Sequence, residues 1–331
     1  MIQSLHIENY KSIQRLTLPC KKLNVFIGEP NSGKSNLIEA LSLLSQDMLS
    51  EKNFKQVIRF KTIGDLFFDF NINQPIIIKT GLIDAELKYK VREDGITENR
   101  FSLTFKNVKD NMESSFTLSH DGTINQDKVA IILTEFLYYE YKRIQTFQSH
   151  FYTHLISPYG ENLPGVLLSN SEHRRWVSDF FQSKGFKLTL KPAENDINMS
   201  KLVDEEIYSY PYYTISETMQ RVVFYMLAIK TNKNSILLFD EPESNTFPFY
   251  TKFLAESIAL DDTNQFFITT HNPYLLGSLI QKSKLKDINI VVVRMKDYKT
   301  EAFPIKSEQI KDMLSEGGDV FFDLSKFIEN D

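Results

Sequence analysis

The sequence has one cysteine among its 331 residues and no long apolar run. A single cysteine, Cys20, cannot form a disulfide within the chain, which suits a reducing cytoplasm. No apolar run approaches the roughly 18 residues that a membrane span needs, and residues 1–8 lack the basic and apolar regions of a signal peptide. These absences predict a cytoplasmic protein without a membrane partner.

An excess of positive charge is missing as well, because the formal net charge is −5. Nucleic-acid-binding surfaces usually show as a basic excess, so the charge gives no support for nucleic acid as a partner. A local basic patch leaves that partner open at residues 173–175, His-Arg-Arg, beside Trp176. The simpler interpretation of the patch is the solvated face of a helix.

The chain does have ample material for a core. Hydrophobic residues make up 42% of the sequence and aromatic residues 13%, which excludes a disordered chain. A length of 331 residues allows two domains or one large α/β domain with an insertion. We find no internal repeat and no long heptad run.

Residues 28–35 read Gly-Glu-Pro-Asn-Ser-Gly-Lys-Ser and fit the pattern G-x-x-x-x-G-K-[ST] without a mismatch. An apolar run of strand type precedes this octet and apolar residues at helical spacing follow it, a context that a chance match would lack. Backbone N–H groups of such a loop point at phosphate oxygens. We predict that Lys34 lies over the β- and γ-phosphates of a nucleotide and that the Ser35 hydroxyl binds Mg²⁺. The predicted nucleotide-binding residues here are Gly28, Asn31, Ser32, Gly33, Lys34, Ser35 and Asn36.

The remaining pattern alternates between strands and helices. Short strands are predicted over 2–8, 15–18 and 23–27, with the helix after the octet ending near Asn53. Antiparallel hairpin strands are then predicted over 75–78, 82–91, 101–108 and 115–119. Helices over 127–148 and 172–183 precede strands over 186–190 and 199–208. Buried strands of parallel-sheet type are predicted over 235–239, 265–268 and 288–293.

These elements predict an α/β fold whose nucleotide core is split between the two ends of the chain. We expect residues 1–55 and 210–300 to form that core around a mixed or parallel sheet. Residues 56–125 are expected to form an antiparallel β-subdomain and residues 126–209 an inserted helical lobe with short strands. Residues 301–331 are expected to form a C-terminal tail.

Two acids, Asp240 and Glu241, follow the buried strand at 235–239. A carboxylate at the end of a strand beside the phosphate loop is well placed for Mg²⁺, so we predict Asp240 as a metal ligand. Glu241 would then orient and deprotonate the attacking water. The alternative is a solvated turn without a role in catalysis.

Two further positions are candidates for anion contacts. His271 follows the strand at 265–268, at the sheet edge where ligands bind, and could contact the γ-phosphate. Ser216 is a plausible N-cap of an apolar helix, whose N-terminus is an anion site. The simpler alternatives are a structural histidine and a capped helix.

Taken together and in this order, these motifs resemble the ABC-type ATPases of the SMC, RecF and OLD-like branch, in particular AAA15-like members, over most of the chain. Residues 28–35 are similar to the Walker A motif of that branch and residues 237–241 to its Walker B motif with a catalytic glutamate. His271 is similar to its switch histidine and residues 216–221 to its signature motif. Residues 9–13 look like its N-terminal segment, which implies that Lys11 lies near the phosphates.

The resemblance implies a P-loop NTPase of the ABC-ATPase type that binds ATP and Mg²⁺. It also implies an ATP-dependent homodimer or larger assembly, in which Ser216 of one copy contacts the nucleotide of the other. The chain resembles a stand-alone ATPase, because it has no long coiled coil and no D-x-D pair of a Toprim nuclease domain. Closure would then act on a partner effector such as a nuclease, in DNA repair or anti-phage defence.

The chain departs from the branch at three places. Thr218 stands two residues after Ser216, where a glycine is usual, and residues 244–248 lack a histidine common in OLD-like members. No Q-loop glutamine stands out, and Gln74 is the candidate for that metal ligand. Thr218 favours an alternative function, a slow or non-hydrolysing ATP-gated scaffold or sensor.

Two other classes of protein fit the sequence less well. A GTPase or a monomeric P-loop kinase is disfavoured because the chain has no Asn-Lys-x-Asp motif. An acid directly after Asp240 also suits activation of water better than transfer to a substrate. A transporter's ATPase subunit is disfavoured because the N-terminal segment and the Ser216 region look like the DNA-transaction branch.

Overall fold

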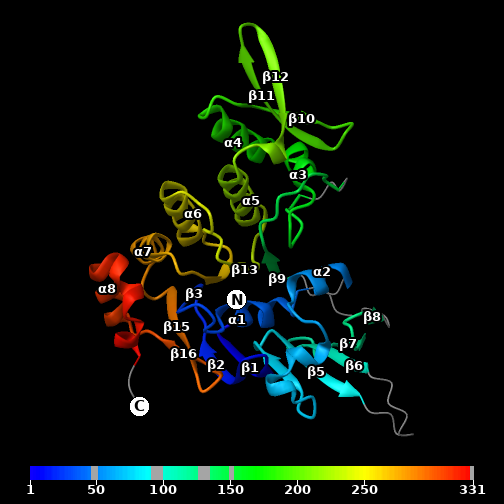
Figure 1. The fold of residues 1–331 in the computed structure, drawn as a ribbon, viewed down its shortest axis with the longest axis vertical. Coiled ribbons are helices and arrows are strands. Elements are labelled where there is room, and N and C mark those ends of the chain that lie inside the picture. The colour runs from blue at the N-terminus through cyan, green and yellow to red at the C-terminus, as the bar shows by residue number, and fades with distance from the viewer. Residues whose placement is uncertain (46–50, 91–99, 126–134, 149–152, 329–331) are drawn as a thin grey trace.

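The computed structural model describes residues 1–45, 51–90, 100–125, 135–148 and 153–328. Within these ranges the chain forms three β-sheets with helices around them (Figure 1). The lobe that carries β10, β11 and β12 stands at one end of the long axis, and the other two sheets lie towards the opposite end. The predicted α/β fold is confirmed.

The six-stranded core sheet has the order β16-β15-β3-β14-β13-β9. Its strands are β3 (Leu23–Ile27), β9 (Phe136–Tyr139), β13 (Ile236–Asp240), β14 (Gln265–Thr269), β15 (Ile288–Lys296) and β16 (Lys299–Pro304). All neighbouring strands are parallel except β16, which pairs antiparallel with β15.

Both faces of the core sheet are buried, which explains the continuous apolar runs in its strands. On one face Phe26 and Leu238 pack with α1 (Lys34–Ser42). On the other face Val25 and Leu237 pack in a second cluster with three helices. These helices are α5 (Glu217–Thr231), α6 (Pro248–Leu260) and α7 (Pro273–Lys282).

The second sheet is antiparallel and has the order β2-β1-β4-β5-β6-β7-β8. Its strands are β1 (Ser4–Tyr10), β2 (Ile13–Pro19), β4 (Ile76–Lys79), β5 (Ile83–Lys90), β6 (Arg100–Asn107), β7 (Glu113–Ser119) and β8 (Ile124–Asn125). Between β2 and β4 the chain also forms α2 (Glu51–Val57), η2 (Ile63–Leu66) and η3 (Phe68–Phe70).

The first two strands differ from their expected place in the nucleotide core. β1 pairs with β4, with His6 opposite Lys79, and therefore extends the antiparallel sheet. The physical reason is the alternation in β1, where Leu5 and Ile7 are fully buried and the intervening residues are less so. Such a half-buried alternation is typical of antiparallel strands.

The helix predicted over 127–148 is wrong for the part that the structure describes. Residues 126–134 lie outside the described residues, but Phe136–Tyr139 form strand β9 beside β13. The aromatic side chains of this strand are buried on both faces of the core sheet, since Phe136 and Tyr139 belong to different core clusters. Pairing with a distant strand therefore outweighs the helical spacing of the apolar residues.

The upper lobe contains helices α3 (Leu163–Ser169) and α4 (Ser171–Gln182) and the sheet β10 (Lys187–Lys191), β11 (Asp196–Val203) and β12 (Glu206–Pro211), followed by η4 (Tyr212–Thr214). The prediction of a single strand over 199–208 is wrong, because the segment forms the two strands β11 and β12. They turn at Asp204 and Glu205, whose φ angles are 48° and 68°. Asp204 is a residue type found in such turns, but Glu205 stands where glycine usually follows.

The basic run on α4 and the tryptophan beside it contact neighbouring elements. Arg174 donates to the carbonyls of Leu167 and Leu168 at the end of α3, and Trp176 stacks on Phe253 of α6 with 6.4 Å between ring centroids. These contacts tie part of the patch to neighbouring elements, whereas Arg175 is exposed.

The C-terminal segment is more than a tail. Its first residues belong to β16 in the core sheet, and α8 (Ser307–Glu316), η5 (Gly317–Phe322) and η6 (Leu324–Phe327) follow. Ile310 and Val320 are buried in the same cluster as α7. None of the helices in the described ranges is both long and apolar enough to cross a membrane.

Candidate nucleotide site

The core sheet brings distant motifs to one edge. β3, β13 and β14 are neighbours and run parallel, so their carboxyl ends meet. The octet 28–35 follows β3, Glu241 follows β13, and His271 comes two residues after β14. Ligands of open α/β sheets bind at this edge.

The phosphate loop holds its lysine over backbone carbonyls. The Lys34 Nζ donates to the carbonyl oxygens of Gly28 at 2.9 Å and Glu29 at 2.8 Å, and lies 3.5 Å from the Ser32 hydroxyl. Burial lowers the pKa of Lys34, and three nearby carboxylates act in the opposite direction. The loop thus presents a desolvated cation next to the N-terminus of α1.

Two glycines allow the loop to pack against the edge of the sheet. A Cβ on Gly28 would lie 2.1 Å from the carbonyl oxygen of Val293 in β15. Gly33 has a φ of +100°, and a Cβ there would lie 2.0 Å from the Thr300 hydroxyl of β16. Larger residues at these positions would push the loop away from both strands.

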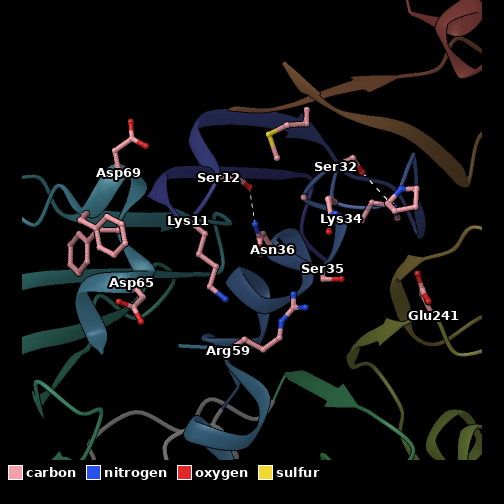
Figure 2. A pocket seen from close by; sticks show the side chains of 16 residues that line it. Lys11, Ser12, Ser32, Lys34, Ser35, Asn36, Arg59, Asp65, Asp69 and Glu241 are labelled. Atoms are coloured by element: carbon pink, nitrogen blue, oxygen red, sulfur yellow. Dashed lines mark hydrogen bonds between the residues drawn. The ribbon is translucent and has the colours of Figure 1, made fainter. Parts of the chain in front are cut away.

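A cavity of about 770 Å³ opens beside the loop (Figure 2). This volume lies within the range of about 300–1,000 Å³ that small-molecule sites occupy. The residues that line it are Lys11, Ser12, Pro30, Asn31, Ser32, Gly33, Lys34, Ser35, Asn36, Arg59, Asp65, Phe67, Asp69, Phe70, Glu241 and Met295. Six of the seven residues predicted from the octet region are in this lining; Gly28 instead contributes its carbonyl to Lys34.

Ser35 and Asp240 form a pair of oxygen ligands suited to Mg²⁺. The Ser35 hydroxyl donates to the Asp240 carboxylate at 3.3 Å, and the Thr269 hydroxyl donates to the same oxygen. Burial raises the pKa of Asp240, while these two hydrogen bonds oppose the shift. Among the described residues no cluster of three or more His, Cys, Asp or Glu side chains could hold a metal ion. This donor set fits a Mg²⁺ ion that shares its ligands with nucleotide phosphates.

Glu241 and His271 lie in direct contact. The His271 Nδ1 is 2.9 Å from a Glu241 carboxylate oxygen, and Glu241 also lines the cavity. The Glu241 backbone is left-handed, with a φ of 46°, and its N–H donates to the Thr269 carbonyl and hydroxyl oxygens at 3.2 and 3.0 Å. These bonds hold the carboxylate of Glu241 at the cavity rather than in the core.

Two family models of ATPase domains match the chain. The model described as an AAA ATPase domain matches residues 1–163, and the model described as an AAA domain, putative AbiEii toxin, Type IV TA system, matches residues 113–277. Together they span residues 1–277. No curated protein matches the sequence.

Solved structures that match this chain in fold include heads of SMC proteins. A crystal structure of an SMC head bound to the C-terminal winged-helix domain of ScpA is 17% identical, with a TM-score of 0.53 over 94% of this chain and 99% of that chain. An SMC head domain with an extended coiled coil, bound to the C-terminal domain of ScpA from Pyrococcus furiosus, is 14% identical, with a TM-score of 0.49 over 95% and 98%. The SMC head domain from Thermotoga maritima is 12% identical, with a TM-score of 0.45 over 92% of this chain and 99% of that chain.

The two family models cover residues 1–277 with ATPase-domain sequence, and the SMC head shares the fold of this chain; together they support an ABC-type ATPase of the SMC/RecF-like branch. P-loop ATPases of this branch bind a nucleotide, usually with Mg²⁺. Residues 28–35 are called the Walker A loop and residues 237–241 the Walker B motif below, after the motifs that they resemble.

The N-terminal segment of this ATPase reaches the cavity through Lys11. Its Nζ pairs with Glu39 of α1, and Glu39 also accepts from the Arg59 guanidinium. Glu39 is only 5% exposed, so it needs these cations. An acid among the buried apolar residues of α1 is a signal that could have identified Glu39, whereas we find no local pattern that indicates Arg59.

A series of hydrogen-bonded hydroxyl and amide groups connects the Walker A loop to β16. The Asn36 amide donates to the Ser12 hydroxyl at 2.7 Å, and Ser12 is 2.7 Å from the Thr300 hydroxyl. Thr300 also lies 3.2 Å from the carbonyl of Ser32. The predicted residue Asn36 thus positions the loop as well as lining the cavity.

Ser216, the predicted signature serine, lies apart from the cavity of its own chain. Ser216 is exposed at the N-cap position of α5, and its side chain makes no capping hydrogen bond to a described residue. The Thr218 hydroxyl donates to the Asn245 carbonyl at 3.1 Å. This bond connects the signature segment to the turn after the Walker B strand.

Gln74 has no place in this site. Its side chain is exposed, its carbonyl accepts from the Asn9 amide at 2.7 Å, and the described residues that line the cavity do not include it. The suggestion that Gln74 is a metal ligand therefore receives no support from the geometry.

A buried acid next to the Walker B motif makes protein stability depend on pH. Glu243 is 3% exposed and accepts from the Thr270 hydroxyl, and burial raises its pKa to about 7. The folded chain therefore keeps this proton at pH values where the unfolded chain has lost it, and stability falls as pH rises from about 4.5 to 7.

We expect Glu243→Gln to reduce the loss of stability at rising pH, because the amide keeps a neutral acceptor for the Thr270 hydroxyl. Relative to wild type, the free energy of unfolding of the variant should rise by about 3 kcal/mol between pH 4.5 and pH 8. Urea unfolding of both proteins at several pH values measures this difference in unfolding free energy. Glu256 forms a partly exposed ion pair with Lys282, with 3.1 Å between the carboxylate oxygen and the Nζ. As a control, Glu256→Gln should show the same dependence of stability on pH as wild type. Identical profiles for Glu243→Gln and wild type would contradict the assigned pKa.

Proposed function

We propose that this protein hydrolyses ATP and that ATP closes two copies of it around the nucleotide to control a partner protein. The observation that carries the catalytic part is the position of Glu241. It lines the same cavity as Lys34 and Ser35 and follows the carboxylate that pairs with Ser35. A general base must lie within reach of the water that it deprotonates, and Glu241 has this access.

The side chains divide the work in this mechanism. Lys34 and the amides of the Walker A loop stabilise negative charge on the β- and γ-phosphates. Ser35 and Asp240 would hold Mg²⁺, and the ion would supply positive charge against the phosphate oxygens.

Glu241 accepts a proton as the water oxygen bonds to the γ-phosphorus and the bond to the β-phosphate oxygen breaks. The contact with His271 keeps the Glu241 carboxylate oriented. We propose that His271 also responds to the γ-phosphate.

The position of Ser216 supports the assembly of two copies. The serine is exposed and lies outside the cavity that contains the Walker A loop, so it is free to contact a nucleotide on another copy. The N-terminus of α5 then presents backbone N–H groups to the γ-phosphate across the interface. Loss of that phosphate would open the assembly.

The solution mass tests this assembly. We expect Mg²⁺ and ATP to double the mass of Glu241→Gln, because this variant keeps the nucleotide intact. Adding Ser216→Arg to Glu241→Gln should abolish the doubling, since a large cation would occupy the interface. Light scattering with size-exclusion chromatography measures the mass of the single and the double variant with and without ATP.

Ser171→Arg in the same Glu241→Gln background is the matched control, because Ser171 is also an exposed serine at the start of a helix. It should leave the doubling unchanged. If neither ATP nor Ser216→Arg changes the mass, the proposed two-copy site is wrong.

The partner is proposed by analogy. An SMC head of similar fold is bound to a domain of ScpA, which is a precedent for a protein partner on this fold. We propose that this ATPase acts on a separate effector such as a nuclease, in DNA repair or anti-phage defence. We place it in the cytoplasm, which its single cysteine suits.

One observation favours a second function, a slow ATP-gated sensor. Thr218 has a side chain where the branch usually has glycine, and its hydroxyl is tied to Asn245. A backbone with this side chain approaches a γ-phosphate less closely. A single-turnover assay separates the two functions, because a sensor binds ATP and assembles but releases phosphate far more slowly than an active ATPase.

A further inference from the structure

One large aromatic side chain is displayed at the rim of the nucleotide cavity. Phe70 is 71% exposed, lies at the end of η3 and lines the cavity. Its φ is +57° and that of Asp69 is +49°. A left-handed conformation is a genuine outlier for a bulky residue, and such strain is concentrated at ligand-binding sites.

The residues around Phe70 hold this turn in place. Phe67 is buried and packs on Phe101 with 5.6 Å between ring centroids. The Phe70 N–H donates to the Phe67 carbonyl at 3.0 Å, and the buried Asn9 donates from its amide to the carbonyl of Asn71 at 3.1 Å. The ring of Phe70 is therefore displayed from a fixed turn.

The two ends of the cavity differ in charge. Figure 2 shows Lys34 and Ser35 towards one end and Asp65 and Asp69 at the other, with Lys11 between them. Lys34 and the N–H groups of the loop attract phosphates and offset the carboxylate of Glu241, which lines the cavity on that side, whereas no such cation among the described lining residues lies beside Asp69. A nucleotide would therefore place its phosphates at Lys34 and its nucleoside at the end that carries Asp69. Phe70 is the neighbour of Asp69 and lines this same cavity.

The aromatic ring is chemically suited to a nucleobase. Bases stack on aromatic side chains, and such stacking tolerates different bases because each has a π-face. Asp65 is already engaged, since it accepts from the backbone N–H groups of Lys61 and Thr62 at 2.7 and 3.0 Å. Of the two aromatic residues among the described residues that line the cavity, Phe67 is 2% exposed and Phe70 is 71% exposed, so Phe70 offers the accessible ring.

We propose that Phe70 is the stacking platform for the base of the bound nucleotide. The inference rests on the proposed function in that Lys34 must bind the phosphates. It adds the subsite for the base, which the Walker motifs do not include. Because stacking does not read hydrogen-bonding groups, adenine and guanine nucleotides bind to this platform alike.

Calorimetric titration of the full chain with ADP, GDP and pyrophosphate, each with Mg²⁺, tests the proposal. ADP avoids both hydrolysis and the assembly that needs a γ-phosphate. Phe70→Ala should weaken ADP and GDP binding by about fivefold to 100-fold and leave pyrophosphate binding unchanged. Phe70→Trp should restore the affinity for ADP.

Phe322→Ala is the matched control, because Phe322 is 89% exposed and is not among the cavity residues. It should bind all three ligands like wild type. Unfolding temperatures equal to wild type show that the variants are folded.

The proposal is overturned if Phe70→Ala binds ADP as tightly as wild type. If that variant binds ADP normally but no longer doubles in mass with ATP in the Glu241→Gln background, Phe70 instead contacts the second copy. Failure of the proposed function has a different signature, which is normal ADP binding without ATP hydrolysis or assembly.

Discussion

Glu241→Gln is expected to lower the rate of ATP hydrolysis by about 10²- to 10⁴-fold, the range for loss of a general base. The amide keeps the size of the side chain and can still accept from His271, but it cannot take a proton from water. The affinity for ATP should remain close to wild type, because the predicted phosphate contacts come from the Walker A loop. Steady-state phosphate release at saturating ATP measures the rate.

A matched substitution is available in α6. Glu256→Gln also replaces a carboxylate with an amide, but Glu256 pairs with Lys282 and is not among the residues that line the cavity. This variant should hydrolyse ATP at the wild-type rate. Wild-type turnover in Glu241→Gln would contradict its assignment as the base. A turnover below detection in wild type itself would favour the slow sensor.

Lys34→Ala is expected to weaken ATP binding by about 30- to 5,000-fold. Removing one partner of a buried, hydrogen-bonded charge contact costs about 2–5 kcal/mol of binding free energy, which gives this range. The Lys34 Nζ now lies on the carbonyls of the loop, at the edge of the cavity that would receive the phosphates. Calorimetric titration with ATP and Mg²⁺ measures the affinity.

Lys21→Ala controls for the loss of lysine-to-carbonyl hydrogen bonds. The Lys21 Nζ also donates to two backbone carbonyls, of Leu285 at 3.2 Å and Ile288 at 2.7 Å, but Lys21 is not among the cavity residues. This variant should bind ATP like wild type. Equal affinities for Lys34→Ala and Lys21→Ala would remove the basis for a phosphate site at the loop.

The predictions that depend on local pattern agree with the structure. The octet 28–35 lies between strand β3 and helix α1 as its flanking residues indicated, because the backbone of such a loop is specified by its own glycines. The strands over 235–239, 265–268 and 288–293 are also present, within a few residues. Their continuous apolar runs can be buried only between two covered faces.

The predictions that failed depend on distant partners. Phe136–Tyr139 has apolar spacing that suits a helix as well as a strand, and pairing with β13, a strand 100 residues later in the chain, decides between them. The hairpin at Asp204 and Glu205 has no glycine or asparagine to mark it, and cross-strand pairing of β11 with β12 sets its position. Local propensity does not include such contacts.

The sequence by itself determined which groups can bind phosphate and metal, because the spacing of Gly28, Gly33, Lys34 and Ser35 already specifies a loop at a helix N-terminus. Tertiary structure decided which other groups share that cavity. Arg59 and Phe70 follow no motif, and they reach the cavity because α1, η2 and η3 pack beside the loop. Side chains far apart in the chain meet only when burial of apolar surface brings their elements together, and no local pattern encodes that meeting.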